Sequence, residues 1–386
     1  MESQRTITED WDPRSPQVLA DFTGATDAMR GKCPVAFSEY LGWSVFNHAD
    51  ITRVIHDHAG FSNAVSKHLA VPNGMDPPVH DQYRALIEPY FQPDQVEAFS
   101  PICHSLVEVL LQSSLPASGE VEVMESVARE YALQAQCAFV GWPPEIREEL
   151  REWLEMSRQA TLSGNRQALR EAADEFAGLV ARVTDRAREE PSNTVTSRLL
   201  REKIYDRFLT QAELTSIFRN WTVGELGTIA GSIGIIMAYL AQDLELQEQL
   251  RQDPAHLPAA IEEILRLDAP LLTNRRRVTR ELELGGKKLP RDAKVTIMWG
   301  AANRDPQAFE QADRFRLDRD QSANLLYGAG VHVCPGAGLA RLELRLFFEH
   351  LLKVTRKFTL SATTPPVRAL YPAGGYSRLS LKVLIS

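Results

Sequence analysis

One cysteine of the chain, Cys334, stands in a glycine-rich segment directly ahead of an apolar stretch that is typical of a helix. The segment contains Gly328, Gly330, Gly336 and Gly338, and glycines let a backbone approach a ligand closely or adopt positive φ. A cysteine just before a helix N-terminus has its thiolate favoured by the helix dipole and by free backbone N–H groups. Such a thiolate can bind the iron of a heme, where it favours cleavage of an O–O bond. The alternative interpretation is a small buried hydrophobic residue in a tight turn.

The residues around the cysteine resemble the heme-binding signature of the cytochrome P450 superfamily. In that signature an aromatic residue is followed by glycine at Cys−4, a basic residue at Cys−2, the cysteine itself and glycine at Cys+2. These places are filled in order by Tyr327, Gly330, His332, Cys334 and Gly336. Tyr327 stands where the family usually has phenylalanine, so its hydroxyl requires a partner. The resemblance implies that Cys334 is the axial ligand of the iron of heme b and that Gly336 belongs to the cofactor-binding loop.

Two further motifs extend the resemblance over most of the chain. Glu263-Ile-Leu-Arg266 matches the Glu-x-x-Arg of the family, whose spacing places both side chains on one face of a helix. The segments 303–306 and 313–315 resemble the irregular stretch that follows in the family, and Arg314 is expected to close a network with the Glu-x-x-Arg pair. We expect this network to support the fold and to take no part in the chemistry.

Four basic residues occupy positions at which the family binds the two heme propionates. His80 and Arg84 lie one helical turn apart, so both can reach a carboxylate on the same side. The forked donors of arginine suit carboxylates well. His332 and Arg276 are the other two candidates, and Arg276 is chosen among three consecutive arginines because it best fits the family's spacing to a following acid.

The segment Gly224-Glu-Leu-Gly-Thr228 matches the centre of the family's long helix above the iron. The family normally carries an acid followed by a threonine there, and the two organise water and deliver protons. Thr228 occupies the threonine position, Gly227 replaces the acid, and Glu225 stands where glycine is usual. Either Glu225 supplies the proton by another path, or water chains serve in its place, or Glu225 points out of the site. Thr228 and Glu225 are therefore the candidate catalytic residues.

The substrate pocket is expected to draw on small and aliphatic side chains. By their position in the family, the candidates are Val223, Gly224, Gly227, Leu272 and Thr273. Such a lining favours a small organic substrate that is apolar or moderately polar.

The elements that must position these residues are mainly helical. Between about residues 81 and 267 apolar residues recur at spacings of three and four, which predicts helices, and strand-like patterns over 278–298 predict small sheets. A further helix is expected over 339–351. Because no linker or repeat divides the chain, we expect one domain over residues 1–386. The resemblance implies the cytochrome P450 fold, which is mainly α with small β-sheets, a triangular helical prism that holds the heme between the central helix and the cysteine loop.

Composition narrows the cellular setting. The formal net charge is −8 over 386 residues, and an acidic surface argues against nucleic acid as the main partner. Four scattered cysteines exclude a disulfide framework. The N-terminus lacks the pattern of a signal peptide. The most apolar window, Ile229–Leu240, has 12 residues, whereas a bilayer span requires about 20. We therefore expect a cytoplasmic protein with no membrane partner.

The resemblance implies a monooxygenase that takes O2 and inserts one oxygen atom into a small organic substrate. No segment resembles a flavin or iron–sulfur reductase, so electrons are expected from a separate ferredoxin or flavodoxin with its reductase. Arg341 and Arg345, on the helix after the cysteine, are candidates for docking an acidic carrier. Two alternatives stay open: a peroxide-driven or non-oxygenating heme-thiolate enzyme, which the missing acid before Thr228 motivates, and a non-catalytic heme-binding member of the family.

Overall fold

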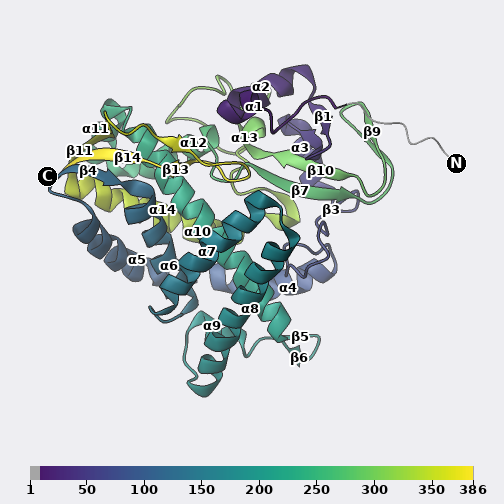
Figure 1. Ribbon diagram of the computed structural model, residues 1–386, viewed down its shortest axis with the longest axis horizontal. Helices are drawn as coiled ribbons and strands as arrows, with labels where there is room; N and C mark the ends of the chain where they lie inside the picture. The colour runs from purple at the N-terminus through teal and green to yellow at the C-terminus, as the bar shows by residue number, and fades with distance from the viewer. Residues whose placement is uncertain (1–8, 386) are drawn as a thin grey trace.

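Helices make up most of the protein, and short strands gather in small sheets (Figure 1). The computed structural model describes residues 9–385. Residues 1–8, on which the expectation about a signal peptide partly rests, lie outside the described residues, as does Ser386. The prediction of a mainly α fold with small β-sheets is confirmed.

The helices follow the apolar periodicity of the sequence, and the helix expected over 339–351 is longer by a few residues at each end. They are α1 Pro16–Ala20, α2 Phe22–Lys32, α3 His48–His56, α4 Val79–Ile87, α5 Pro93–Ser114, α6 Arg129–Val140, α7 Ile146–Ser163, α8 Arg166–Glu189, α9 Val195–Leu199, α10 Gln211–Leu240, α11 Leu244–Gln252, α12 Leu257–Leu267, α13 Trp299–Asn303 and α14 Ala337–Val354, with the short turns η1 Glu88–Phe91, η2 Met124–Ala128, η3 Pro254–His256 and η4 Gly330–His332.

The strands are short and lie mostly toward the two ends of the chain. They are β1 Val35–Ser38, β2 Gly42–Val45, β3 Phe61–Ser62, β4 Ser118–Glu122, β5 Lys203–Ile204, β6 Arg207–Phe208, β7 Thr273–Val278, β8 Leu282–Leu284, β9 Lys287–Leu289, β10 Lys294–Met298, β11 Thr355–Leu360, β12 Val367–Arg368, β13 Tyr376–Arg378 and β14 Ser380–Ile385. The largest sheet has the order β1-β2-β10-β7-β3, and in it β10 pairs parallel with β2 and antiparallel with β7. This sheet brings Arg276 of β7 to the side of the molecule that carries η4 and the cysteine loop.

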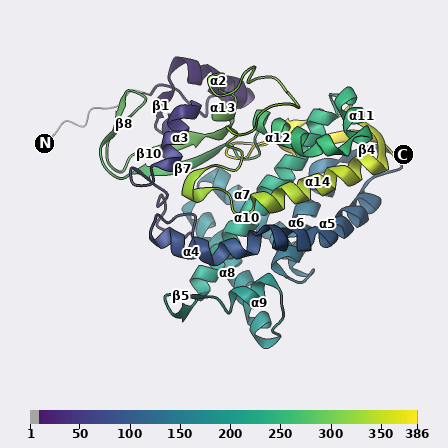
Figure 2. The ribbon, with the colours of Figure 1, turned by 180° about the vertical axis from the view of Figure 1, so that it is seen from behind.

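Helix α10 runs through the middle of the helical part and packs against α6, α8, α12 and α14 (Figures 1 and 2). Its first turn is fixed by a capping box, in which the Thr210 hydroxyl accepts from the Glu213 N–H and the Glu213 carboxylate accepts from the Thr210 N–H. By length and composition α10 could cross a membrane, but 67% of its most apolar 18-residue window is buried inside the protein. A core helix of a large globular domain has this property, so α10 is weak support for a membrane span.

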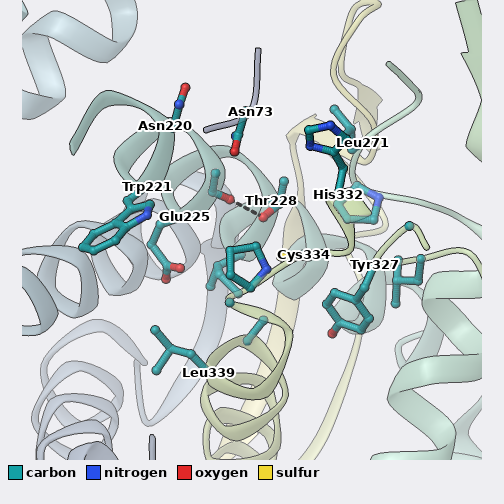
Figure 3. Close-up of a pocket in the computed structure, with 18 of the residues that line it drawn as sticks. Asn73, Asn220, Trp221, Glu225, Thr228, Leu271, Tyr327, His332, Cys334 and Leu339 are labelled. Atoms are coloured by element: carbon teal, nitrogen blue, oxygen red, sulfur yellow. Dashed lines mark hydrogen bonds between the residues drawn. The ribbon is translucent and has the colours of Figure 1, made fainter. Parts of the chain in front are cut away.

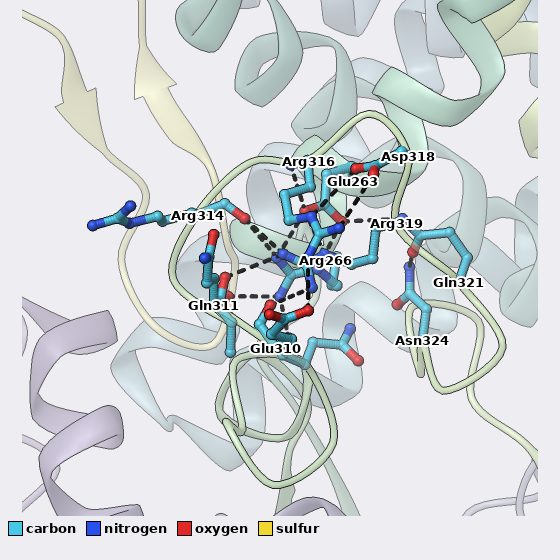
Figure 4. Close-up of polar contacts among 12 residues, drawn as sticks. Glu263, Arg266, Glu310, Gln311, Arg314, Arg316, Asp318, Arg319, Gln321 and Asn324 are labelled. Atoms are coloured by element: carbon cyan, nitrogen blue, oxygen red, sulfur yellow. Dashed lines mark hydrogen bonds and ion pairs between the residues drawn. The ribbon is translucent and has the colours of Figure 1, made fainter.

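A buried ion-pair network ties α12 to the loop after α13 (Figure 4). The side chains of Glu263 and Arg266 are 0% exposed, and Arg266 Nε donates to Glu263 Oε2 at 2.8 Å. Arg319 Nε donates to Glu263 Oε1 at 2.7 Å, and Gln321 donates to Oε2 at 3.0 Å. Burial alone would raise the pKa of Glu263, but the hydrogen bonds from Arg266, Arg319 and Gln321 hold it below its usual value.

The expectation that Arg314 closes this network is wrong in one respect. Arg314 contributes its carbonyl oxygen, which accepts from Arg266 Nη2 at 3.2 Å and from Arg319 Nη2 at 2.9 Å. Its side chain points away from the network in Figure 4. The loop turns so that the backbone of Arg314 faces inward, and the second guanidinium comes from Arg319, whose side chain is 5% exposed.

Candidate functional site

A cavity of about 330 Å³ lies between α10 and the cysteine loop (Figure 3). Its walls come from α10, the cysteine loop, the start of α14, β7 with the residues before it, and the loop between β3 and α4. Its volume is in the range of small-molecule pockets. The predicted site residues that line it are Arg84, Gly224, Glu225, Thr228, Arg276, His332, Cys334 and Gly336.

The cysteine loop is held so that Cys334 faces this cavity. Gly330 has φ of 69°, and a Cβ there would lie 2.7 Å from the carbonyl oxygen of Ile55, so both the backbone conformation and the space require glycine. The Cys334 N–H donates to the carbonyl of Tyr327 at 2.9 Å. Arg84 Nη1 donates to the carbonyl of Val333 at 2.8 Å, so this arginine of α4 holds the loop directly.

The surroundings of the Cys334 sulfur include groups that raise the pKa of its thiol and groups that lower it. Burial raises the pKa of its thiol, while the Gly336 N–H and the nearby Arg84 and Arg341 lower it. The N-terminus of α14, which begins three residues later at Ala337, adds the field of a helix dipole. A bound metal cation would complete the stabilisation of the thiolate, because a coordinated thiol is deprotonated.

Tyr327 lines the cavity, and it is the face of its ring, not its hydroxyl, that contacts a cation. The guanidinium carbon of Arg341 lies 4.4 Å from the centre of the Tyr327 ring. Arg341 Nε also donates to Glu262 at 2.8 Å, and Arg345 pairs with Glu349 at 2.9 Å. Both arginines that were candidates for docking a reductase are therefore engaged with carboxylates of this chain.

A cluster of basic side chains gathers at the other rim of the cavity. The rings of His80 and His332 lie 4.3 Å apart, and His80 Nδ1 contacts Asp81 at 2.9 Å. Within residues 9–385 neither His80 Nε2 nor His332 Nε2, both buried, has a hydrogen-bond partner. Burial, and after it the charges of His80 and Arg276, lower the pKa of His332 to about 3. Buried nitrogens without acceptors, next to arginines, are the donor set that carboxylate groups complete. The residues present thus fit a heme with its propionates at this rim and its iron at Cys334.

We expect His332→Ala to weaken heme retention. A hydrogen bond to a charged group is worth about 1.5–3 kcal/mol, so heme transfer to apomyoglobin is predicted to accelerate by about 10- to 100-fold. His256→Ala is the matched control, because this exposed histidine of η3 pairs with Asp253 at 3.3 Å and does not line the cavity. Equal transfer rates for the two variants would contradict a propionate contact at His332.

The face of α10 opposite the cysteine presents Gly224, Glu225 and Thr228 to the cavity (Figure 3). The Thr228 hydroxyl donates to the Gly224 carbonyl at 2.5 Å, so its oxygen is left to accept a hydrogen bond from the cavity side. Glu225 does not point out to solvent. Its Oε1 is buried, and burial raises the pKa of its carboxyl above the usual value. The interpretation in which Glu225 faces away from the site is therefore not supported.

Four predicted pocket residues lie outside the lining of the cavity. Val223, which is 50% exposed, and Gly227 do not line the cavity. Each directly precedes a lining residue of α10, and one step along a helix turns the side chain by about 100°, away from the cavity. Leu272 lines a second, smaller cavity near α2 and α13. The Thr273 hydroxyl shares a hydrogen bond with the Tyr371 hydroxyl at 2.8 Å.

His80 also lies behind the lining, in contact with His332 and not with the cavity itself. Sequence reasoning missed several lining side chains, and the polar ones stand out: Asn63, Asn73, Gln136, Asn220 and Asn274.

The chain is similar to known proteins of the cytochrome P450 family. The profile of the cytochrome P450 family matches residues 151–370. The chain is 32% identical to 6-deoxyerythronolide B hydroxylase of Saccharopolyspora erythraea over 74% of this chain and 71% of that protein. It is 26% identical to linalool 8-monooxygenase of Pseudomonas putida over 94% of this chain and 90% of that protein. The solved structure of a mutant of P450 EryK, a protein of S. erythraea, in complex with erythromycin B superposes with a TM-score of 0.86 and 26% identity over 95% of this chain and 96% of that one.

The chain belongs to the cytochrome P450 family. Its fold is the P450 fold, and with relatives that are hydroxylases and monooxygenases it is a heme-thiolate monooxygenase. The recognition from the cysteine loop and the Glu-x-x-Arg motif is confirmed.

Proposed function

We propose that the protein binds heme b through Cys334 and oxidises a small, largely apolar organic molecule that carries hydrogen-bonding groups. Electrons come from a separate ferredoxin or flavodoxin with its reductase, the chain acts as one domain over residues 1–386, and it works in the cytoplasm. The observation that carries the cofactor assignment is the placement of Cys334 on the cavity floor, with His332 at the rim and His80 directly behind it. Within residues 9–385 the Nε2 atom of neither histidine has a hydrogen-bond partner.

The bound heme supplies activation of O2 and transfer of one oxygen atom. Side chains of this chain would hold it in place: Cys334 by ligation, Arg276 and His332 at the propionates, and His80 from behind His332. Arg84 contributes by holding the Val333 carbonyl and with it the cysteine loop. On the opposite face Thr228 accepts hydrogen bonds through its oxygen, since its hydrogen is engaged by Gly224.

Polar side chains of the cavity favour a substrate with oxygen or amide groups. Asn73 and Asn220 lie beyond Thr228 on the side away from Cys334 (Figure 3). Asn220 Nδ2 donates to the Val71 carbonyl at 2.9 Å, which leaves its oxygen free to accept. Leu271 and Ala269 supply apolar surface to the same cavity. Two relatives are named for the molecules they oxidise, 6-deoxyerythronolide B hydroxylase and linalool 8-monooxygenase.

The function is tested by turnover of the purified holoenzyme with a surrogate ferredoxin, its reductase and ¹⁸O2. Candidate substrates are first screened for shifts of the heme spin state. We expect one labelled oxygen atom in the product and no product without the reductase. Product formation with hydrogen peroxide alone, and none with reductase and O2, would contradict the proposal.

Replacement of Thr228 is expected to separate electron consumption from product formation. Thr228→Ala removes the acceptor oxygen, so reduced nicotinamide is still consumed while the product formed per electron pair falls. Thr228→Ser keeps the hydroxyl and should retain most of the coupling. The measurement is product against nicotinamide consumed, and unchanged coupling in Thr228→Ala would show that this residue has no role in proton supply.

A further inference from the structure

Two carboxyl groups meet in the protein interior beside the cavity, Glu225 of α10 and Glu343 of α14. Glu343 is 0% exposed, and Glu225 lines the cavity. Within residues 9–385 no hydrogen-bond donor reaches Glu225 Oε1 or either carboxyl oxygen of Glu343. The two residues lie where α10 packs against α14, and each carboxyl group acts on the pKa of the other. Since an ionised carboxylate only accepts, a hydrogen bond between them requires that at least one carries a proton.

The groups that face this pair are acids as well. Cys103 of α5 and Tyr131 of α6 are buried beside it, and Cys334 lies across the cavity. In the described part of the chain, the side chains that act on the pKa of Glu225 and Glu343 are these two carboxyls themselves. Burial and the charge of Glu225 raise the pKa of Glu343 well above its usual range, and burial raises that of Glu225. The pair therefore keeps a proton where exposed carboxyls have lost theirs.

Glu225 lies close to Thr228 along α10 and lines the same cavity. Glu225 precedes Thr228 by three residues, so the two lie one turn apart and about 60° from each other around α10. Both line the cavity, and in Figure 3 Thr228 lies above Cys334 and Glu225 to the left of both. Position 227, immediately before Thr228, is glycine and lies outside the lining.

We propose that Glu225 and Glu343 form a proton-sharing carboxyl pair that delivers a proton to the cavity at Thr228, the task that an acid at position 227 would otherwise perform. With a proton on each carboxyl, the O–H bond of Glu225 breaks and its proton passes to a water molecule that is hydrogen-bonded to the Thr228 oxygen. That water gives one of its own protons to the O2-derived oxygen in the cavity, for which the reductase supplies the electrons. Glu225 is left ionised and accepts the hydrogen bond of the Glu343 O–H. A proton from solvent then restores Glu225, and no electron moves within the pair. Glu343 is a positioning residue that acts through Glu225.

This inference rests on the proposed monooxygenase function, and its first test is independent of turnover. Infrared spectra of the wild-type holoenzyme near neutral pH should contain the C=O stretch of a protonated carboxyl that shifts in D2O. The band should be lost or displaced in Glu225→Gln and in Glu343→Gln. It should persist in Glu245→Gln, the matched control at an exposed glutamate of α11. A wild-type spectrum without such a band, or a band unaffected by both variants, would overturn the proposal.

The second test is the pH dependence of product formation with reductase and O2. Glu225→Gln should lower the product-forming rate by about 100-fold or more, as for loss of a general acid, with the heme spectrum unchanged. Glu343→Gln retains a donor to Glu225 and should keep the pH profile of the wild type. Glu343→Leu removes that donor, so the pKa of Glu225 rises and the alkaline limb should move to higher pH.

The outcomes separate this inference from the proposed function. Suppose the wild-type enzyme turns over with O2 and Glu225→Gln has the same rate and the same pH profile. That result would contradict the proposed role of the carboxyl pair and would leave the proposed monooxygenase function unaffected. Absence of turnover in the wild type with every reductase would instead count against the function. If Glu343→Leu does not fold, the infrared spectra and the product-forming rate of Glu225→Gln still test whether the pair delivers a proton.

Discussion

Cys334→Ala is expected to abolish O2-dependent product formation to the detection limit. A thiolate ligand supplies the electron density that favours O–O cleavage. Within residues 9–385 no other cysteine lines the cavity. Heme, if retained by the propionate cluster, should lack the spectrum of a thiolate complex. The measurement is product formation with reductase and O2, alongside heme content by absorption.

The control for this variant is Cys33→Ala. Cys33 lies far along the chain, at the C-terminal end of α2, where its sulfur contacts the Val35 carbonyl at 3.3 Å. Its replacement should leave turnover and spectrum unchanged. Comparable activity of Cys334→Ala and the wild type would contradict axial ligation by Cys334.

Glu263→Gln is expected to destabilise the protein severely. The carboxylate is fully buried and serves Arg266 and Arg319 together, so its neutralisation leaves two guanidinium groups partly uncompensated in the interior. Removal of one partner of a buried ion pair costs about 3–5 kcal/mol, a large fraction of a typical unfolding free energy. The measurement is the free energy of unfolding of the holoenzyme in denaturant, or the yield of folded protein where the variant does not accumulate.

The neighbouring residue provides a matched control. Glu262 lies on the same helix and pairs with Arg341, whose side chain is 53% exposed. A partly solvated pair of this kind is worth about 0–1 kcal/mol. Glu262→Gln should therefore be close to the wild type, and equal losses of stability in both variants would show that burial of the Glu263 network is not what stabilises the fold.

The sequence predicted the parts of the site that are contiguous along the chain. The cysteine loop could be recognised because a ligand cysteine, the glycines around it and the helix that follows must adjoin in sequence. The helix α14, at 337–354, follows from its apolar periodicity in the same way. Thr228 could be placed because its distance along the chain from the Glu-x-x-Arg helix is nearly fixed.

The parts that were missed depend on how elements cross. Glu343 sits among charged residues in a helix, between Arg341 and Arg345, and only the packing of α14 against α10 reveals its burial beside Glu225. One signal was present: leucines flank Glu343 on both sides and recur at helical spacing, which places this position on the apolar face.

Errors at the pocket and in the ion-pair network have a common physical source. Neighbouring residues on a strand point to opposite faces, so a shift of one position exchanges lining and non-lining side chains. Asn274 lines the cavity, whereas Leu272 and Thr273, which were expected there, do not. In the irregular loop that follows α13, no periodicity indicates whether a backbone or a side chain faces inward, and Arg314 was chosen where Arg319 supplies the guanidinium.

Ligation of heme iron by the Cys334 thiolate is tested most directly by the absorption spectrum of the reduced, carbon-monoxide-bound wild-type protein. A thiolate ligand predicts the long-wavelength Soret band that is characteristic of the family. A band at the shorter wavelength typical of imidazole-ligated heme, in freshly purified protein that has kept its fold, would contradict it.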